Sequence, residues 1–375
     1  MQVPQDVSHQ RVGIVGTGGV ASGYAAFLAS NGHDVALWSP RGKSVSNAEA
    51  EGTLVAVGAL EAECHPMLST SAGELSEFSD VLIIAVPAFG HKMVMDALAP
   101  HIRPGQPIII SSHSAFGALY LGDLLDARRI EAPVIAWSTT ALTSKRTGPG
   151  EVRIGSLRAR VDICTLPEAA SHDGLKTCQK LFGDRFLVCD GLLAVTLSNV
   201  NAQNHLGIAL CNLTRMEKGE TWRQVDYMTP KVARLLEALD SERLTIAHTL
   251  GLKVRSVHEH FSLSYHVTEN SDLGEMFVEM QQRKLGGNGP ASADSRYVTE
   301  DLPYGIVPMV ALGDLAGRPA VLHRAGLDIF CALYGRDFRR ECDLLDALDL
   351  GRFNLMELIA AARRGTTTPP PRADG

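Results

Sequence analysis

Apolar positions in the first half of the chain fall into short, nearly continuous runs. Each run is followed by a stretch in which apolar residues recur at helical spacing, as around Tyr24, Phe27 and Leu28. Continuous apolar runs of this kind are typical of strands buried in a parallel sheet. The strand-like runs are 12–15, 34–38, 80–86, 107–111 and 134–138, followed by a hairpin or edge-strand pair at 151–165 and a last strand at 186–189. This alternation predicts an α/β fold, with a Rossmann-type dinucleotide-binding domain over residues 1–190.

The pattern changes after Asp190, where helical periodicity takes over. One long helix is expected over 192–216. Thr229 and Pro230 open a second helix, because threonine caps a helix well and proline suits its first position. Further helices are expected at 256–265, 271–285, 301–317, 319–334 and 352–364. Residues 191–375 are therefore predicted to form an all-α substrate domain, with a disordered tail from about residue 366.

A strand, a glycine turn and a helix follow one another at residues 11–28, where the turn reads Gly-Thr-Gly-Gly-Val-Ala. Gly16 can adopt unusual backbone angles, Gly18 lets a pyrophosphate approach the backbone, and Ala21 lets helix and strand pack closely. Phosphates would then lie over the free N–H groups at the start of the helix. The cofactor-binding residues expected here are Gly16, Gly18, Gly19, Val20 and Ala21, together with Val86 and Pro87 in the loop after the strand at 80–86. An ordinary strand-to-helix turn is the alternative interpretation.

The end of the second strand indicates which dinucleotide is bound. An NAD site usually has an acidic residue there for the ribose 2′-hydroxyl, whereas an NADP site uses a nearby arginine. This chain has Ser39, Arg41 and Lys43 and no acidic residue between them. Arg41 can bind a 2′-phosphate with two hydrogen bonds, and Lys43 adds a second positive charge. NADP(H) is therefore the preferred cofactor and NAD(H) the alternative, unless these cations merely form a solvated loop.

The composition narrows the class of protein. A chain of 375 residues is too long for one ordinary core, so two domains are expected. A net charge of −7 disfavours a nucleic-acid partner, and no apolar run is long enough to span a membrane. The seven cysteines are scattered, and neither they nor the histidines show metal-ligand spacing, which favours reduced thiols, no metal site and a cytoplasmic location. The expected partners are small-molecule substrates, and a homodimer is possible.

Polar residues interrupt the apolar segment at 198–205, within the first helix expected in the second domain. At helical spacing Ser198, Asn201, His205 and Asn212 share one face. Buried polar side chains need partners, and an interdomain cleft facing the cofactor would supply them. Histidine ordinarily titrates near neutral pH, so His205 is the candidate for proton transfer. A hydrogen-bonded interior histidine is the alternative.

Residues 296–307 read Arg-Tyr-Val-Thr-Glu-Asp-Leu-Pro-Tyr-Gly-Ile-Val and follow a glycine-rich stretch at 286–290, a plausible hinge. This block resembles the signature of the octopine/nopaline (opine) dehydrogenase family. The resemblance implies an NAD(P)H-dependent oxidoreductase acting on CH–NH groups, which condenses an amino acid or amine with an α-keto acid through an imine. It also implies that His205 is the catalytic acid/base and that Asp301 supports it or holds the substrate amine. Arg296 would reach the cofactor pyrophosphate as the domains close.

The chain departs from this family pattern in two places. The family histidine is usually followed by proline, whereas here Leu206 follows it. The loop after the strand at 134–138 usually reads Thr-x-Pro-aromatic-x-x-Arg, of which only Thr140 and Arg146 remain. A cation should hold the keto acid carboxylate, and Arg146, Lys145 and His113 are the candidates. The expected substrate-binding residues are His113, Thr140, Arg146 and Asn201, in a pocket whose amino-acid preference need not be the standard one.

Two other classes of protein share parts of this pattern. Ketopantoate- and β-hydroxyacid-type reductases have the same two-domain plan but reduce a ketone without an amine, and they usually carry a lysine on the helix that here carries His205. A non-catalytic NADP(H)-sensing protein would keep the glycine turn while its catalytic residues drift. The presence of His205, Arg296 and Asp301 argues against that alternative.

Overall fold

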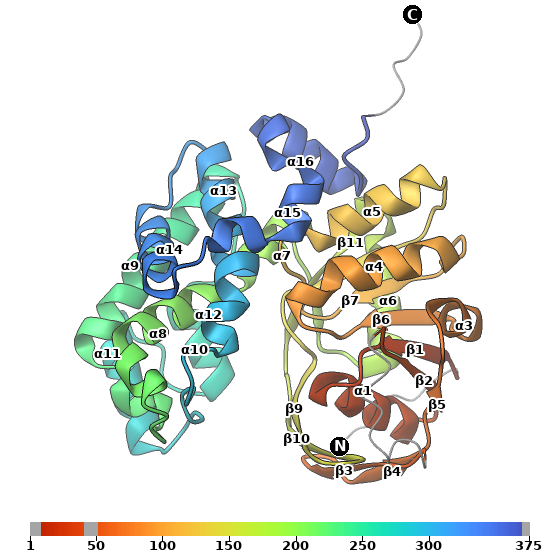
Figure 1. The fold of residues 1–375 in the computed structure, drawn as a ribbon, viewed down its shortest axis with the longest axis horizontal. Coiled ribbons are helices and arrows are strands. Elements are labelled where there is room, and N and C mark those ends of the chain that lie inside the picture. Colours follow the sequence, from red (N-terminus) through yellow and green to blue (C-terminus); the bar gives the residue numbers. More distant parts are fainter. Residues whose placement is uncertain (1–8, 41–51, 370–375) are drawn as a thin grey trace, which may run out of the picture. The chain divides into compact units, whose positions relative to one another are not determined.

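The computed structural model describes residues 9–40 and 52–369, and these form two compact units. Unit 1 comprises Met1–Thr196 with Met356–Gly375, and unit 2 comprises Leu197–Leu355. Figure 1 shows the ribbon, coloured along the sequence. The division differs from the predicted one in that the chain after residue 355 returns to unit 1, whereas all of 191–375 was expected in the helical domain.

Unit 1 is built on an eight-stranded sheet in the order β12-β11-β8-β7-β6-β1-β2-β5. The strands are β1 (Arg11–Val15), β2 (Asp34–Trp38), β5 (Met67–Leu68), β6 (Val81–Ile84), β7 (Ile108–Ile110), β8 (Val134–Trp137), β11 (Val161–Leu166) and β12 (Phe186–Val188). All neighbours pair in parallel except β11 and β8, which are antiparallel. The central strands are fully buried, which explains why they are continuously apolar in the sequence. The predicted Rossmann-type domain is confirmed.

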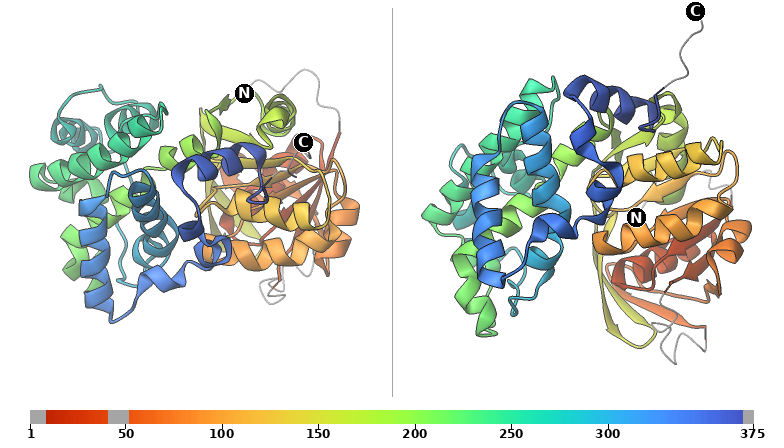
Figure 2. Two further views of the ribbon diagram at one scale, coloured as in Figure 1. Left: turned by 90° about the horizontal axis from the view of Figure 1, so that it is seen from above. Right: turned by 45° about the horizontal axis from the view of Figure 1, so that its top comes forward.

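Helices cover both faces of this sheet. They are α1 (Gly19–Ser30), α3 (Ala72–Phe78), α4 (His91–Leu98), α5 (Gly117–Ala127) and α6 (Ser171–Phe182), with short 3₁₀ turns η1 (Ala88–Gly90), η2 (Ala99–His101) and η3 (Glu168–Ala170). α3, α4 and α5 contact one another in succession, and Figure 2 shows α4 and α5 side by side. α1 and α6 meet through Tyr24, Phe27 and Phe182, and the rings of Phe27 and Phe182 stack with centroids 5.4 Å apart.

A second, four-stranded sheet covers the outer side of α1. Its order is β4-β3-β10-β9, with β3 (Leu54–Gly58), β4 (Ala62–Cys64), β9 (Leu142–Gly148) and β10 (Glu151–Leu157). α1 thus packs between two sheets, which explains why eight consecutive residues of this helix are buried. The hairpin expected over 151–165 is wrong, because β10 pairs with β3 and β9 while β11 belongs to the large sheet.

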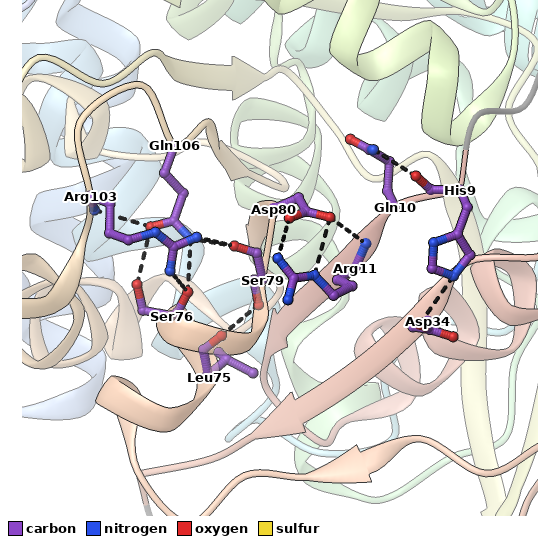
Figure 3. A network of polar contacts seen from close by, with 10 residues as sticks. All are labelled: His9, Gln10, Arg11, Asp34, Leu75, Ser76, Ser79, Asp80, Arg103 and Gln106. Atoms are coloured by element: carbon purple, nitrogen blue, oxygen red, sulfur yellow. Dashed lines mark hydrogen bonds and ion pairs between the residues drawn. The ribbon is translucent and has the colours of Figure 1, made fainter.

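Polar contacts stabilise the amino-terminal edge of the large sheet (Figure 3). Arg11, at the start of β1, forms an ion pair of 2.7 Å with Asp80, just before β6. Hydrogen bonds from Arg11 lower the pKa of the Asp80 carboxyl. Gln106 donates to the carbonyl oxygens of Ser76 and Ser79 at 3.0 and 2.7 Å. These contacts join strands and loops to one another, so this edge is structural, and ligands are expected at the opposite, carboxyl edge.

The end of the described chain packs on unit 1 through α16 (Leu355–Arg364) and the residues that follow it. Asp123 accepts hydrogen bonds from the Thr366 hydroxyl at 2.8 Å and from the Thr367 backbone N–H at 2.6 Å. A Cβ on Gly122 would lie 1.7 Å from the carbonyl oxygen of Gly365, so the segment crosses α5 very closely. Thr366 and Thr367 therefore make specific contacts, contrary to the disordered tail predicted from about residue 366. Residues 370–375 lie outside the described residues.

Unit 2 is helical, as predicted. Its helices are α8 (Asn201–Glu217), α9 (Pro230–Thr249), α10 (Val257–Tyr265), α11 (Leu273–Gln282), α12 (Arg296–Thr299), α13 (Val307–Leu315), α14 (Val321–Tyr334) and α15 (Asp343–Leu348), with a π-helical turn η5 (Leu302–Ile306) and 3₁₀ turns η4 (Gln224–Tyr227), η6 (Phe338–Glu341) and η7 (Leu350–Arg352). α8 contacts α9, α12, α14 and η5 and so lies at the centre of the unit. The chain enters it through α7 (Gly191–Ser198).

The single long helix expected over 192–216 is in fact two helices, α7 and α8. Between them the side-chain oxygen of Asn199 accepts a hydrogen bond from the backbone N–H of Asn201 at 3.0 Å. Asparagine side chains compete in this way with the helical backbone pattern, which explains the break.

Candidate functional site

The turn between β1 and α1 depends on Gly16. Its φ is +123°, and a Cβ there would lie 2.6 Å from the carbonyl oxygen of Ala85 and 3.2 Å from a methyl carbon of Val86. Its N–H donates to the carbonyl oxygen of Trp38 at 2.7 Å. The turn is therefore held between the carboxyl ends of β2 and β6, and only glycine fits at this position.

The two glycines that follow have different reasons to be glycine. Gly18 is exposed, and a Cβ there would meet no atom within 4 Å. Gly19 lies against β9, where a Cβ would be 3.0 Å from the Cα of Lys145, 3.0 Å from the carbonyl oxygen of Ser144 and 3.1 Å from the backbone nitrogen of Arg146. Gly18 therefore leaves open space at the start of α1, whereas Gly19 allows β9 of the second sheet to pack closely against α1. Val20 packs partly buried against the core and Ala21 is completely buried, so these two residues serve packing.

The open space at Gly18 fits the phosphates of a dinucleotide. Gly18 is the N-cap of α1 and supplies no side-chain cap, so the N–H groups of the first turn have no intrahelical partner. Such a helix start attracts phosphate. Ser39 directly follows β2, and Val86 and Pro87 lie two and three residues after the end of β6, so all three lie at the same carboxyl edge of the sheet. The predicted cations Arg41 and Lys43 lie outside the described residues.

Arg146 lies beside this turn. On β9, its Nη1 donates to the carbonyl oxygen of Thr17 at 3.0 Å. It was predicted to bind substrate, but its position is determined by the packing of β9 on α1 rather than by the loop after β8. Thr140, in that loop, is half-buried and precedes Ala141, whose N–H donates to the hydroxyl of Tyr24 at 2.9 Å.

His113 follows β7 at the same edge and is only 3% exposed. Burial, with a smaller contribution from His91, lowers the pKa of His113 to about 3. Neither of its ring nitrogens has a hydrogen-bond partner among the described residues. Its loop contains non-glycine residues with positive φ at Ser112 (63°), Ala115 (47°) and Phe116 (58°), a strained backbone of the kind that gathers at functional sites. A pKa lowered by burial keeps His113 neutral near pH 7, which disfavours it as the cation that holds a carboxylate.

In unit 2, His205 on α8 lies next to the predicted partner, Asp301. The distance from His205 Nδ1 to a carboxylate oxygen of Asp301 is 2.7 Å, and both side chains are 22% exposed. The carboxylate fixes a proton on Nδ1, which leaves Nε2 as the ring atom that can exchange protons. Nε2 has no hydrogen-bond partner among the residues that the structure describes. The pair can thus accept and donate a proton at one defined atom.

The close approach of η5 to α8 brings these two residues together. A Cβ on Gly305 would lie 2.4 Å from the Cβ of Ala202, so only glycine allows η5 to pack at this point. Ala202 and His205 are three residues apart and share one face of α8. Asp301 immediately precedes η5, and π-helical turns of this kind are frequent at functional sites.

The polar face predicted along 198–212 is only partly present. Asn201 begins α8 one turn before His205 and is half-buried. Asn212 instead sits at a kink with φ −127° and ψ 16°, and its side chain donates to the carbonyl oxygen of Ile208. Gln203, on another face, donates to the buried Asp240 at 2.7 Å. The polar residues therefore divide between the surroundings of His205 and the internal structure of unit 2.

The glycine-rich stretch at 286–290 is hydrogen-bonded to residues 222–224, where η4 begins. Gln224 N–H donates to the Gly287 carbonyl at 3.0 Å, and Gly289 N–H donates to the Trp222 carbonyl at 2.9 Å. A Cβ on Gly289 would lie 2.3 Å from the Trp222 ring. This stretch was expected to be a hinge. Gly289 is needed for close packing, whereas a Cβ on Gly287 would meet no atom within 4 Å.

Arg296 and Tyr297 are the first two residues of α12. The Arg296 side chain forms an ion pair with Glu300 and is 69% exposed, so its guanidinium remains accessible to a ligand. Its predicted contact with a cofactor pyrophosphate stays a prediction. Tyr297 was missed as a site residue: its ring stacks on His205, with ring centroids 3.5 Å apart and planes 11° from parallel. Its place in the Arg-Tyr block was the only sequence signal for it.

All seven cysteines are free thiols, and no group of three or more histidine, cysteine or acidic residues in the described ranges could hold a metal ion. Within those ranges no helix combines the length and apolar character needed to cross a bilayer.

Comparison with known proteins agrees with the fold. The family model "NAD/NADP octopine/nopaline dehydrogenase, alpha-helical domain" matches residues 188–334, and the model of ketopantoate reductase PanE/ApbA matches residues 12–167. Opine dehydrogenase of Arthrobacter sp. (strain 1C) is 30% identical over 345 residues, which cover 90% of this chain and 94% of the relative.

Two solved structures show the same fold at low sequence identity. Octopine dehydrogenase in complex with NADH and agmatine has a TM-score of 0.80 at 17% identity, covering 96% of this chain and 99% of that one. Yersinopine dehydrogenase with NADP+ bound has a TM-score of 0.67 at 17% identity, covering 95% and 98%.

These findings first define a class: a nicotinamide-dinucleotide-dependent oxidoreductase with a Rossmann-type domain and a helical domain. Within that class, the chain belongs to the opine dehydrogenase family. It is therefore an enzyme of the opine dehydrogenase type, which acts on the CH–NH group of its donors, and the family resemblance read from residues 296–307 is confirmed.

Proposed function

We propose that the enzyme reductively condenses the amino group of an amino acid or amine with an α-keto acid, with NADPH as the preferred cofactor. The observation that carries this proposal is the His205–Asp301 pair at 2.7 Å, in a chain of the opine dehydrogenase family. Relatives with solved structures contain NADH with agmatine or NADP+, so both dinucleotides and an amine ligand occur among proteins of this fold.

His205 would carry out the proton transfers of the condensation. The amine attacks the keto carbon to give a carbinolamine, which must receive a proton on oxygen before water leaves and the imine forms. With Nδ1 held by Asp301, Nε2 is the atom that accepts and returns these protons. The cofactor, when bound, supplies the hydride that reduces the imine carbon. The negative charge of Asp301 stabilises the imidazolium that exists between the transfers.

The turn in unit 1 would hold the cofactor, with Gly16, Gly18 and the start of α1 around its pyrophosphate. The absence of an acidic residue at Ser39 favours a 2′-phosphate, with Arg41 and Lys43 as its ligands. Arg146, beside Thr17, adds a further cation on the cofactor side of the sheet. We therefore assign Arg146 to the cofactor rather than to the keto acid. Thr140, His113 as a neutral group, and Asn201 remain the proposed substrate contacts.

The test of the reaction is a panel of amino acids and amines against several α-keto acids, followed by the absorbance of NADPH. We expect oxidation of NADPH to require both an amine and a keto acid. Because the amino-terminal half also matches the ketopantoate reductase model, the second candidate is reduction of a ketone alone. Oxidation of NADPH by a keto acid without any amine would favour that candidate and overturn the condensation.

The test of the residue is His205→Ala. General acid–base catalysis typically contributes about 10²- to 10⁴-fold, so kcat should fall by that factor while NADPH affinity is retained. His258→Ala is a matched control, because His258 also pairs with a carboxylate in unit 2, at 3.1 Å from Glu237, with exposures of 22% and 28%. If folded His205→Ala keeps more than about a tenth of the wild-type kcat, His205 is only a paired interior histidine.

A further inference from the structure

The imidazole of His205 is held by two contacts in perpendicular directions. Asp301 binds Nδ1 in the plane of the ring at 2.7 Å. Tyr297 covers one face of the ring, with centroids 3.5 Å apart and planes 11° from parallel. The carboxylate alone fixes one atom of the imidazole, whereas a stacked ring fixes its plane. Since the outer torsion of histidine has broad minima, the plane would otherwise be poorly defined.

Both contacts come from one short segment of chain. Tyr297 and Asp301 are four residues apart, the spacing that places two side chains on the same face of a helical segment. α12, which begins one residue before Tyr297, packs against α8, and η5 is fixed there by the close approach of Gly305 to Ala202. The segment therefore presents an aromatic face and a carboxylate to the same imidazole.

Tyr297 is itself fixed at its far end. Its hydroxyl donates a hydrogen bond to the side-chain oxygen of Gln224 at 2.6 Å. The backbone of Gln224 is in turn bonded to Gly287, so the acceptor belongs to the paired stretch described above. Burial raises the pKa of Tyr297 to about 12, so the phenol keeps its proton and remains a donor throughout the working pH range.

We propose that Tyr297 is a positioning residue for proton transfer: its ring holds the plane of the His205 imidazole and so directs Nε2 along one line while Asp301 holds Nδ1. Gln224 holds Tyr297 in place through its hydroxyl. The inference rests on the proposed function only in taking His205 as the group that transfers protons.

The test compares Tyr297→Leu, which removes the ring, with Tyr297→Phe, which keeps the ring and loses the bond to Gln224. A stacked aromatic pair contributes enough that Tyr297→Leu should lower kcat roughly two- to tenfold, with the KM for NADPH unchanged. Tyr297→Phe should restore most of kcat.

Tyr334→Leu is the matched control. Tyr334 is also a half-buried tyrosine of unit 2, with its hydroxyl bonded to the carbonyl oxygen of Ala293 at 2.7 Å and its ring against Phe338. This variant loses a comparable amount of aromatic packing without touching His205. It should leave kcat as in the wild type. An equal loss of kcat in both leucine variants would overturn the proposal, because a general loss of stability would then explain it.

A direct measurement does not depend on turnover. In NMR spectra, the Cε1–H signal of His205, identified by its absence in His205→Gln, should be shifted upfield by the stacked ring in the wild type and in Tyr297→Phe. In Tyr297→Leu it should return to the usual range. If the wild-type signal has no ring-current shift, the stack does not exist and the inference fails, whatever the fate of the proposed reaction. If Tyr297→Leu does not fold, the NMR spectra of the wild type and of Tyr297→Phe and the kcat of Tyr297→Phe still decide the question.

Discussion

Alanine at Gly18 and alanine at Gly19 are expected to have opposite effects, although the two glycines are neighbours in one turn. A methyl group on Gly18 would project into space that contains no protein atom within 4 Å. A methyl group on Gly19 would lie 3.0–3.1 Å from three backbone atoms of β9. The first change should therefore affect only a ligand, and the second should affect only the fold.

The magnitudes follow from these contacts. At Gly18 the φ is −77°, which alanine also adopts without strain. Replacing glycine at the N-cap costs some stability, but alanine also lowers the entropy of the unfolded chain, and the two effects offset each other. The free energy of unfolding should therefore change by less than about 0.5 kcal/mol. At Gly19 the neighbours are backbone and cannot move cheaply, so overpacking should cost about 2–3 kcal/mol, partly offset by the same entropy term. A net loss of about 1–2 kcal/mol corresponds to a Tm lower by about 2–8 °C for a unit of this size.

The assay is a thermal melt of each variant together with a titration of NADPH by its fluorescence. Gly18→Ala should keep the wild-type Tm and lose about ten- to a hundredfold in NADPH affinity, since charged hydrogen bonds to the pyrophosphate are obstructed. Gly19→Ala should show the lower Tm, with near-normal affinity in the fraction that is folded. Wild-type affinity in Gly18→Ala would refute the placement of phosphate over that residue, and a wild-type Tm in Gly19→Ala would refute the tight packing of β9.

Two further predictions concern the residues proposed to bind the cofactor and the buried His113. Arg41→Ala and Arg146→Ala should each weaken NADPH binding about ten- to a hundredfold, and Arg41→Ala should leave NADH binding almost unaffected. Lys145→Ala is the control for Arg146→Ala, because adjacent strand residues point to opposite faces. Equal losses of NADPH affinity in all three variants would indicate only a loss of net charge. His113→Gln should make the free energy of unfolding less sensitive to acid. The pKa of His113 is about 3 in the folded state and 6.5 in the unfolded state, so the unfolded state binds the extra proton. The stability of the wild type therefore falls as the pH drops from 6.5 toward 3. By urea unfolding the wild type should lose about 2 kcal/mol more than the variant between pH 7 and pH 5, and identical losses would show that His113 is not buried in a neutral form.

Much of the fold could be predicted because its signals are local. The apolar runs at β1, β6 and β7 reflect burial on both faces, and Thr229-Pro230 marks the start of α9 within the sequence itself. The second sheet could not be found in the same way. A strand was predicted in the region of β10, but its pairing with β3 joins segments that are separated by about half of unit 1, and the mostly polar sequence of β9 carries no strand signal. The return of α16 to unit 1 is likewise decided by contacts with α5, distant in sequence.

The site shows the same limit. The glycine turn could be read from the sequence because its conformational requirement lies within a few residues, but the separate reasons for Gly18 and Gly19 appear only once β9 is placed against α1. The neutral state of His113 depends on how deeply it is buried and on the nearby imidazole of His91, neither of which has a sequence signal. A cation was expected because residue type was the only information available.

The segment that carries Tyr297 and Asp301 combines a signal that is visible in the sequence with contacts that only the structure shows. Their spacing of four residues is visible in the sequence and already places an aromatic ring and a carboxylate on one helical face. What the spacing cannot state is which side chain they face, because that depends on Gly305 allowing η5 to approach α8 at Ala202, one turn from His205. α8 thus supplies the proposed proton-transfer group, His205, while a segment about ninety residues later in the sequence orients its imidazole. Substitutions in that segment should therefore alter kcat while leaving His205 itself in place.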